Sequence, residues 1–414
     1  MIKNKIIYNS FSNYQYKLIK AQGSFLWNDK GNKLIDFTSG WNVTNLGWNH
    51  PEITEAIIKQ AKKNTYAPMW TADPIQEEYA KQLIQSLPKT LNAVGRATGG
   101  TEANEEAIKT ARAYTGRQKI LGFKDTYHGQ SFSTLAIGYS SDYAISKAVG
   151  PLVPGFIQMN FPRVLFDDKN ELLVLKKFSE KLEKILFKKN IATMICEAGI
   201  ITGWGSTFVA PRGFLKEVRK LTKKYGTLLI LDEVGTGFSR CGKLFGMELE
   251  NVIPDIVTFA KAMVNGALAI GAMVTTDQIA QATLAKSNLT STFGWTPIAC
   301  AAALKTLEIH KRDRVWEKAK KDGDYLLKIL QSELKNIPLI DGVNGVGMEI
   351  GVHLKKNEEE KSKMKQMLEK ARQLGLELAY ADDYNFQLMP SLTIKRDVLD
   401  KGIEIFIKTI KSSS

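Results

Sequence analysis

A pair of carboxylates and a lysine each follow a short apolar run, at positions that packing alone explains poorly. Residues 227–231 lead directly into Asp232 and Glu233, and residues 256–259 are followed two positions later by Lys261. An ionised carboxylate beside a buried strand needs a partner, so we expect a cation to face Asp232. A lysine at the mouth of a sheet is partly dehydrated, which lowers its pKa and makes it a usable nucleophile. Taken by itself, however, Lys261 fits a surface position better.

Two further motifs could bind other parts of a ligand. Gly99, Gly100 and Thr101 precede a helical stretch, so free backbone N–H groups and the helix dipole could hold a phosphate there. A plain helix N-cap is the alternative interpretation of this segment. Tyr127 and His128 stand before a glycine at the end of an apolar run, where an aromatic side chain can offer a flat face to a ring. Core packing is the alternative there.

The four motifs together fit one ligand. It would carry a phosphate for the helix start, an aromatic ring, a cationic ring nitrogen for Asp232 and an aldehyde that forms a Schiff base with Lys261. Pyridoxal 5'-phosphate (PLP) meets each requirement, and we expect it as the cofactor. A dinucleotide is disfavoured because the Gly-Thr-Gly turn at 235–237 does not complete a GxGxxG motif.

An alternation of strands and helices must bring these motifs together. Strand-like runs at 193–196, 227–231 and 256–259 enclose an amphipathic, helix-like stretch at 212–225. This spacing predicts a mostly parallel sheet covered by helices, with ligands bound beyond the carboxyl ends of the strands.

The chain changes character after about Thr296. A long helix is expected at 298–310, followed by a strand-like, glycine-punctuated run at 342–351 and a last helix at 397–410. We interpret this portion as a separate α+β lobe.

Composition limits the class of protein. The 414 residues include 57 Lys+Arg against 43 Asp+Glu, but the lysines alternate with Glu and apolar residues as on solvated helix faces, so we expect no nucleic-acid partner. Three widely spaced cysteines and four unpaired histidines predict neither a disulfide framework nor a metal site. No apolar run approaches the roughly 20 residues that span a membrane, and the first ten residues do not resemble a signal peptide. We therefore expect a cytoplasmic protein without a membrane association.

The same motifs resemble those of the class III (omega/ornithine-type) PLP-dependent aminotransferases. The matching segments, in the order of that family, are 99–105, 127–129, 231–240, 254–261 and 389–392. The similarity covers nearly the whole chain and is more specific for cofactor than for substrate.

The resemblance implies the fold-type I architecture of PLP enzymes. That is an α/β fold with a large domain, built on a mainly parallel seven-stranded sheet, and a smaller α+β domain. The expected boundaries are 1–50 for the N-terminal part of the small domain, 51–300 for the large PLP-binding domain and 301–414 for the C-terminal part of the small domain. Members of the family resemble one another in forming homodimers with shared active sites.

The resemblance also implies roles for individual residues. Lys261 would form the Schiff base and shuttle the proton, and Asp232 would keep the pyridine nitrogen protonated. Tyr127 and Val234 would cover the two ring faces, with His128 as a further cofactor contact.

Further cofactor contacts follow from the same resemblance. Gly99, Gly100 and Thr101 would hold the phosphate together with Thr292 of the neighbouring subunit. Glu197 matches a family glutamate beside the cofactor pocket.

Departures from the family pattern concern the substrate. Gln130 stands where ornithine-type members have an arginine, and residues 200–208 offer no second acid after Glu197. Near the expected place of a mobile arginine stand Tyr380 and two aspartates, Asp382 and Asp383. Both known routes to accepting a dicarboxylate are therefore expected to be absent.

Several large side chains are expected around the substrate. Trp41, Met69 and Trp70 resemble pocket-wall positions of the family, with core packing as the alternative for each. Trp295 and Thr296 stand where the family usually has Gly-Asn, and Ala262 replaces the glycine after the lysine, so a narrower pocket floor is expected.

The sequence thus predicts an aminotransferase that moves an amino group from an amine or amino acid to a 2-oxo acid through pyridoxamine phosphate. The alternative is a PLP-dependent amino-acid epimerase or racemase of the same family, because the glutamate switch is missing.

Overall fold

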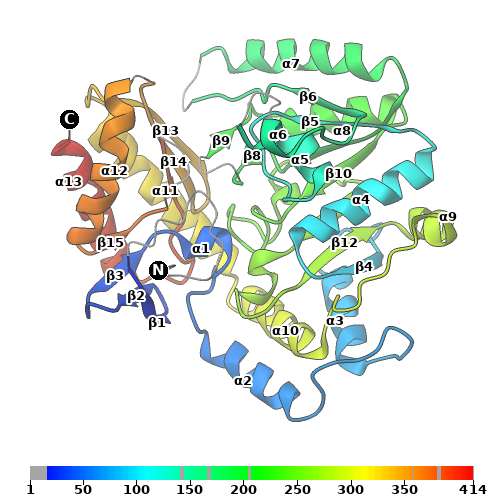
Figure 1. The fold of residues 1–414 in the computed structure, drawn as a ribbon. Coiled ribbons are helices and arrows are strands. Elements are labelled where there is room, and N and C mark those ends of the chain that lie inside the picture. The colour runs from blue at the N-terminus through cyan, green and yellow to red at the C-terminus, as the bar shows by residue number, and fades with distance from the viewer. Residues whose placement is uncertain are drawn as a thin grey trace.

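A seven-stranded sheet forms the centre of the larger part of the molecule (Figure 1). The computed structural model describes residues 16–139, 144–165, 169–203, 207–356, 358–379 and 384–413. In spatial order the strands are β4 (Ala93–Ala97), β12 (Gly271–Thr275), β11 (Ile256–Phe259), β10 (Leu228–Asp232), β7 (Ile191–Glu197), β5 (Lys119–Phe123) and β6 (Phe156–Met159). Only β12 runs antiparallel to its neighbours, so the expected mainly parallel sheet is confirmed.

Successive residues of the central strands point to opposite faces of the sheet, and each face has its own apolar cluster. Ile120 and Ile230 pack on one face, whereas Leu121 and Leu231 pack on the other. The first face is covered by α4 (Gly100–Thr115), α5 (Phe132–Gly138) and α9 (Asp277–Ser287). The second is covered by α7 (Glu171–Leu186) and α8 (Phe214–Lys224). Because both faces are covered, these strands read as continuous apolar runs.

Three helices pack together beside the sheet. They are α2 (Pro51–Ala61), α3 (Pro74–Gln85) and α10 (Pro297–Arg312). The Asp73 side chain accepts hydrogen bonds from the backbone N–H groups of Ile75 and Gln76, which caps α3. Trp295, just before α10, is 1% exposed and packs on Tyr79 at 4.9 Å between ring centroids.

Strands from both ends of the chain form a second lobe together with three helices (Figure 1). One sheet consists of β1 (Leu18–Gln22), β2 (Phe25–Asn28), β3 (Lys33–Asp36) and β15 (Leu376–Glu377). The other consists of β13 (Ile340–Val346), β14 (Glu349–Leu354) and β16 (Asn385–Leu388). The helices are α11 (Val315–Leu334), α12 (Glu358–Gln373) and α13 (Arg396–Lys411). We call this part the α+β lobe.

The expected elements appear with small differences. The helices expected at 212–225, 298–310 and 397–410 are α8, α10 and α13, whose ends differ by at most two residues. The run at 342–351 is not one strand but the turn of a hairpin, β13 and β14. The chain reverses at Gly347, whose φ of 59° lies in the left-handed region that glycine adopts readily.

Short elements complete the described part of the chain. They are α1 (Ser39–Asn42), α6 (Ala144–Val149), β8 (Ile200–Ile201), β9 (Phe208–Val209), and the 3-10 helices η1 (Gly246–Leu249) and η2 (Lys261–Val264). Within the ranges that the structure describes, no helix has both the length and the apolar character needed to cross a membrane.

Candidate active site

The carboxyl ends of three adjacent strands meet at one edge of the central sheet. Asp232 ends β10 and lies in register with Glu197, the last residue of β7, and with Thr258 of β11. Lys261 follows β11 by two residues and begins η2. The parallel pairing therefore brings together residues far apart in the sequence at the edge where open α/β sheets bind their ligands.

The backbone aims Lys261 into this site. Its φ is 48°, a left-handed conformation that is uncommon for a residue with a side chain and costs about 1 kcal/mol or more. Burial lowers the pKa of the Lys261 amine, while the negative charges of Glu197, Asp232 and Glu349 oppose that effect. A dehydrated amine of lowered pKa is a better nucleophile at neutral pH than a surface lysine.

Three donors fix the carboxylate of Asp232, which is 2% exposed. One oxygen accepts from the Asn104 side chain at 2.8 Å and lies 2.7 Å from Nδ1 of His128. The other accepts from the backbone N–H of Val234 at 2.9 Å. No Lys or Arg pairs with Asp232 in the described ranges, so the cation expected to face it is not supplied by the described chain.

Glu197 is the second carboxylate at this edge. One of its oxygens accepts from the backbone N–H of Thr202 at 2.8 Å and from the Thr202 hydroxyl. The other oxygen, Oε1, is buried and has no hydrogen-bond partner. Burial, reinforced by the charge of Asp232, raises the pKa of Glu197 to about 7. An unpartnered buried oxygen of this kind indicates a place for a ligand.

The N-terminus of α4 forms the opposite wall. Gly99 precedes α4 with an extended backbone, and Gly100 begins the helix. A Cβ atom at Gly100 would lie 3.0 Å from both Val234 methyl groups, so any larger residue would press on the turn that follows β10. Thr101 lies close to Gly129, where a Cβ atom would come within 2.5 Å of the Thr101 hydroxyl. The two glycines therefore leave room for an anion at the helix N-terminus.

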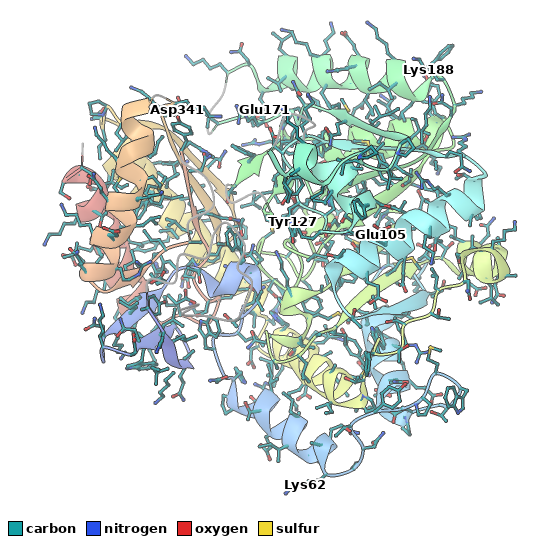
Figure 2. The ribbon with its side chains drawn as sticks, viewed as in Figure 1. Lys62, Glu105, Tyr127, Glu171, Lys188 and Asp341 are labelled. Carbon is teal, nitrogen blue, oxygen red and sulfur yellow. The ribbon has the colours of Figure 1, made fainter. Side chains whose placement is uncertain are left out.

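These groups line one pocket of 290 Å³, which we call the Lys261 pocket. Of the residues predicted for the cofactor, it is lined by Gly99, Gly100, Thr101, Tyr127, His128, Glu197, Asp232, Val234 and Lys261. Figure 2 shows Tyr127 near the middle of the molecule, whereas Lys62 and Lys188 lie at its periphery.

The Lys261 pocket fits PLP in two respects: the groups it offers for binding, and the buried polar atoms that have no hydrogen-bond partner. A helix start suits the phosphate, a buried carboxylate suits a cationic ring nitrogen and an amine suits the aldehyde. Nε2 of His128 and Oε1 of Glu197 are both buried without a partner, as expected at the edge of a ligand site.

Other predicted residues lie outside the lining of this pocket. Thr292 is exposed, and Trp70 is 83% exposed. Gln130 is exposed and donates to the Tyr139 hydroxyl at 2.9 Å. The indole N–H of Trp41 donates to Oε1 of Gln387 at 3.0 Å.

The expected narrow pocket floor is not observed. Trp295 and Ala262 are buried at 1% and 2% exposure, and neither lines the pocket. Trp295 belongs to the core between α3 and α10, where its indole N–H donates to the carbonyl of Gly271 at 2.7 Å. Tyr380, Asp382 and Asp383 lie outside the described residues.

Glu233 has a structural role although it adjoins Asp232. Successive residues of an extended chain point in opposite directions, and Glu233 accepts from the hydroxyl of Thr236 and the backbone N–H groups of Gly246 and Met247. Burial raises its pKa to about 7. The two adjacent carboxylates therefore do not act as a pair.

Three functional neighbours were not identified from the sequence. Asn104 orients Asp232, and Thr202 orients Glu197. The signal for Asn104 was its place one helical turn after the glycines. Gln387, which contacts Trp41, follows no pattern in the sequence.

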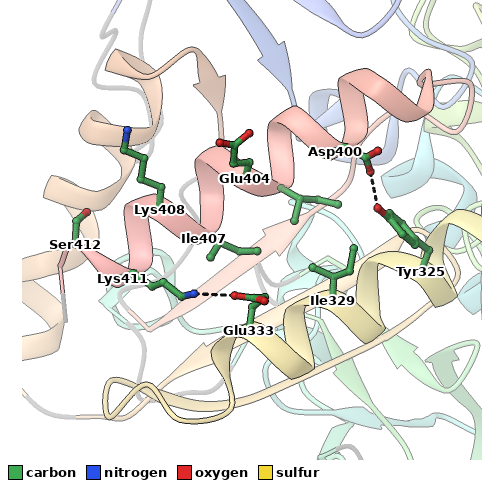
Figure 3. A pocket seen from close by; sticks show the side chains of 10 residues that line it. Tyr325, Ile329, Glu333, Asp400, Glu404, Ile407, Lys408, Lys411 and Ser412 are labelled. Carbon is green, nitrogen blue, oxygen red and sulfur yellow. Dashed lines mark hydrogen bonds and ion pairs between the residues drawn. The ribbon is translucent and has the colours of Figure 1, made fainter.

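A larger hollow, of 630 Å³, lies between α11 and α13, away from the predicted motifs (Figure 3). Its rim includes two pairs, Tyr325 with Asp400 and Lys411 with Glu333. None of its lining residues has a buried polar atom without a partner, so nothing in it indicates a bound ligand.

Comparisons with known proteins agree with this geometry. A family model described as aminotransferase class-III matches residues 7–410. An acetylornithine aminotransferase of Lactococcus lactis is 33% identical over 405 residues, covering 97% of this chain and 100% of that protein.

Solved structures are similar over the same extent. An (S)-enantioselective omega-transaminase from Thermomicrobium roseum is 31% identical, with a TM-score of 0.88 and coverage of 96% of this chain and 92% of that one. An amine transaminase from an uncultivated Pseudomonas species, solved with PLP bound, is 25% identical, with a TM-score of 0.92 and coverage of 100% and 99%.

The fold and the site define a PLP-dependent enzyme of fold type I. The chain belongs to the class III aminotransferases and carries out transamination, with amines or amino acids and 2-oxo acids as its classes of substrate.

Proposed function

We propose that Lys261 and Asp232 are the catalytic residues of this aminotransferase. The observation that carries the proposal is their meeting in one 290 Å³ pocket, with the α4 N-terminus on its opposite wall. PLP, when bound, supplies an aldehyde that takes up the amino group and a ring that withdraws electrons from the reacting carbon.

The residues of the protein would position the cofactor and transfer protons to and from the reacting groups. Lys261 would hold the aldehyde of the cofactor through its amine, and the same amine would move a proton at the substrate carbon. Asp232 would hold the ring nitrogen and keep it protonated, because a nearby carboxylate raises the pKa of a cationic partner. Asn104 and His128 hold Asp232 in place.

The phosphate and ring contacts follow from the lining of the pocket. We assign the phosphate to the backbone N–H groups of Gly99, Gly100 and Thr101. Tyr127 and Val234, which both line the pocket, would cover the two faces of the ring.

A second subunit would complete the site. Exposed apolar side chains lie close to Thr292: Phe293 is 65% exposed, and its ring contacts that of Tyr66, which is 40% exposed. Tyr66 and Phe293 thus form an exposed aromatic pair of the kind that subunit interfaces cover. We therefore propose a homodimer in which Thr292 of one subunit reaches the phosphate of the other.

The domain boundaries and the location in the cell are part of the same proposal. Residues 1–50 and 301–414 would form one small domain against 51–300, which the pairing of β15 with β3 supports. All three cysteines are buried and free, as suits the reducing cytoplasm.

The test is the visible absorption spectrum of the purified holoenzyme after single additions of amines and amino acids, without an acceptor. Loss of the cofactor's visible band, restored by a 2-oxo acid, is expected for the donor. A band that persists while the substrate carbon exchanges its hydrogen with solvent would instead indicate an epimerase. No cofactor band after the addition of PLP would contradict the site.

A further inference from the structure

A buried carboxylate lies behind the wall of the Lys261 pocket. Glu349, the first residue of β14, is fully buried. Its oxygens accept from Nδ2 of Asn42 at 2.7 Å, from the Thr207 hydroxyl at 2.8 Å and from Nε2 of Gln387 at 2.5 Å. Burial raises the pKa of Glu349, but these three donors and the charge of Arg240 oppose that effect. Hydrogen bonds that a carboxyl group only accepts favour its ionised form.

No cation of the described residues forms an ion pair with Glu349. Arg240 is also fully buried, but it donates to the carbonyls of Met348 and Pro390 and to the Asn45 side chain. The Lys261 amine is committed to the cofactor in the proposed function. A buried charge without an ion pair is unfavourable for stability, so its presence calls for a functional reason.

Hydrogen bonds connect Glu349 to the wall of the pocket. The amide Nε2 of Gln387 donates both to Glu349 and to the carbonyl of Thr202 at 2.7 Å, and Thr202 lines the pocket. Oε1 of Gln387 accepts from Trp41. Both N–H groups and the oxygen of the Gln387 amide are thus engaged in hydrogen bonds. The amide therefore has no N–H left to donate to a substrate carboxylate. Through Thr202 the wall continues to Glu197, whose Oε1 is buried and unpartnered.

The segment that holds Glu349 in place has a strained backbone. Ser39, Trp41 and Asn42 have φ values of 43°, 71° and 61°, each in the left-handed region. Such conformations cost roughly 1 kcal/mol or more each and concentrate at functional sites. The side-chain oxygens of Ser39 and Asn42 are buried and have no partner. This strained segment places the amide of Asn42 on Glu349 and the indole of Trp41 on Gln387.

We propose that Glu349 sets the charge preference of the amino donor. Its carboxylate lies behind Thr202 of the pocket wall, to which Gln387 connects it, and favours primary amines whose distal group is cationic over those whose distal group is a carboxylate. The physical reason is that a charge buried away from water is screened weakly and acts over several ångströms. This inference rests on the proposed function, because it presupposes that the donor amine reacts in the Lys261 pocket.

Three donors with the same carbon chain test the proposal: 1,4-diaminobutane, 1-aminobutane and 4-aminobutanoate. They differ in the charge of the group distant from the reacting amine. Loss of the visible band of the holoenzyme in single-turnover experiments gives a second-order rate constant for each donor. We expect this rate constant to fall in that order. In Glu349→Gln, which keeps the shape and removes the charge, we expect the ratio of diamine to aminobutanoate to fall by roughly tenfold or more.

A second measurement distinguishes charge from packing. Removal of a nearby negative charge lowers the pKa of a cation, so in Glu349→Gln the pH titration of the visible band, which reports the Lys261 nitrogen, should shift to lower pH. The matched control is Glu333→Gln, an exposed residue of α11 paired with Lys411, which should change neither the ratio nor the titration.

The outcomes separate this inference from the proposed function. Faster reaction of the wild-type enzyme with 4-aminobutanoate than with the diamine overturns the role of Glu349, even if the variant fails to fold. An unchanged ratio and titration in a folded Glu349→Gln enzyme overturns it as well. If neither these amines nor any amino acid discharges the visible band, it is the proposed function that fails.

Discussion

Nδ1 of His128 lies 2.7 Å from the carboxylate of Asp232, while Nε2 of the same ring is buried without a partner. The ring therefore holds Asp232 with one nitrogen, and its other nitrogen has no hydrogen-bond partner. Together with Asn104 and the Val234 N–H, it fixes the direction of the carboxylate before any ligand binds. Preorganised charge of this kind is effective in catalysis because it need not reorient during the reaction.

Asp232→Asn removes this charge but keeps the shape of the side chain. We expect the transamination rate to fall roughly 10³-fold, since the ring nitrogen loses the group that keeps it protonated. The cofactor should remain bound through its other contacts. Steady-state rates and cofactor absorbance check both expectations, with the exposed Asp324→Asn as control. An unchanged rate would mean that another group protonates the ring.

Lys261→Ala should abolish turnover and leave the chain folded. The substitution removes both the attachment point of the aldehyde and the group that moves the proton. It also relieves the burial of an amine, so we expect no loss of stability. Turnover is measured alongside circular dichroism and the urea midpoint. Normal turnover in a folded variant is incompatible with the assigned site.

Gly235→Ala should disturb Glu197 through its neighbour. A Cβ atom at residue 235 would lie 2.0 Å from the hydroxyl of Thr202, which holds Glu197. We expect a loss of stability of about 1–3 kcal/mol, as for other overpacked sites, and weaker PLP binding. Urea unfolding and PLP titration measure the two effects. Adding Thr202→Ala removes the clashing atom, so stability should partly return; failure to return would locate the strain elsewhere.

Glu106 makes stability depend on pH. It is 4% exposed, its Oε2 has no partner, and burial together with the charge of Glu102 raises its pKa to about 7. Because the pKa of Glu106 is higher in the native state than its ordinary value of 4.5, the native state binds this proton more tightly than the unfolded chain does. The free energy of unfolding is therefore highest at low pH and falls as the pH rises to about 7.

Glu106→Gln cannot ionise, so it should be more stable than wild type at high pH. We expect the difference in unfolding free energy between variant and wild type to grow by roughly 2 kcal/mol from pH 5 to pH 8. Urea titrations at both pH values measure it. A difference that is the same at both pH values would show that Glu106 does not titrate in this range.

The sequence was sufficient to predict the sheet and most of the residues that line the Lys261 pocket within one chain. Apolar runs followed by Asp232 and Lys261 predicted strand ends, and the parallel arrangement of β10 and β11 brings those ends together. The glycines before α4 predicted a helix start with free N–H groups, and the helix begins at Gly100. These features depend on local spacing, which a sequence carries directly.

Long-range packing decided the rest. Trp295 was expected at the pocket and lies in the core, and Glu233 was grouped with Asp232 but caps η1 from the other side of the chain. Neither outcome can be inferred from neighbouring residues, because each depends on which distant segment fills the adjoining space.

By itself, the sequence determined the family and the cofactor and predicted groups that line one pocket, since these depend on motifs of a few consecutive residues. Only the tertiary structure decided which residues lie behind the wall of the Lys261 pocket. Asn42, Thr202, Glu349 and Gln387 come from separate segments and meet through side-chain hydrogen bonds. In the proposed role of Glu349, the reach of its charge depends on burial, which weakens screening by water, and burial is a property of the folded chain rather than of any motif.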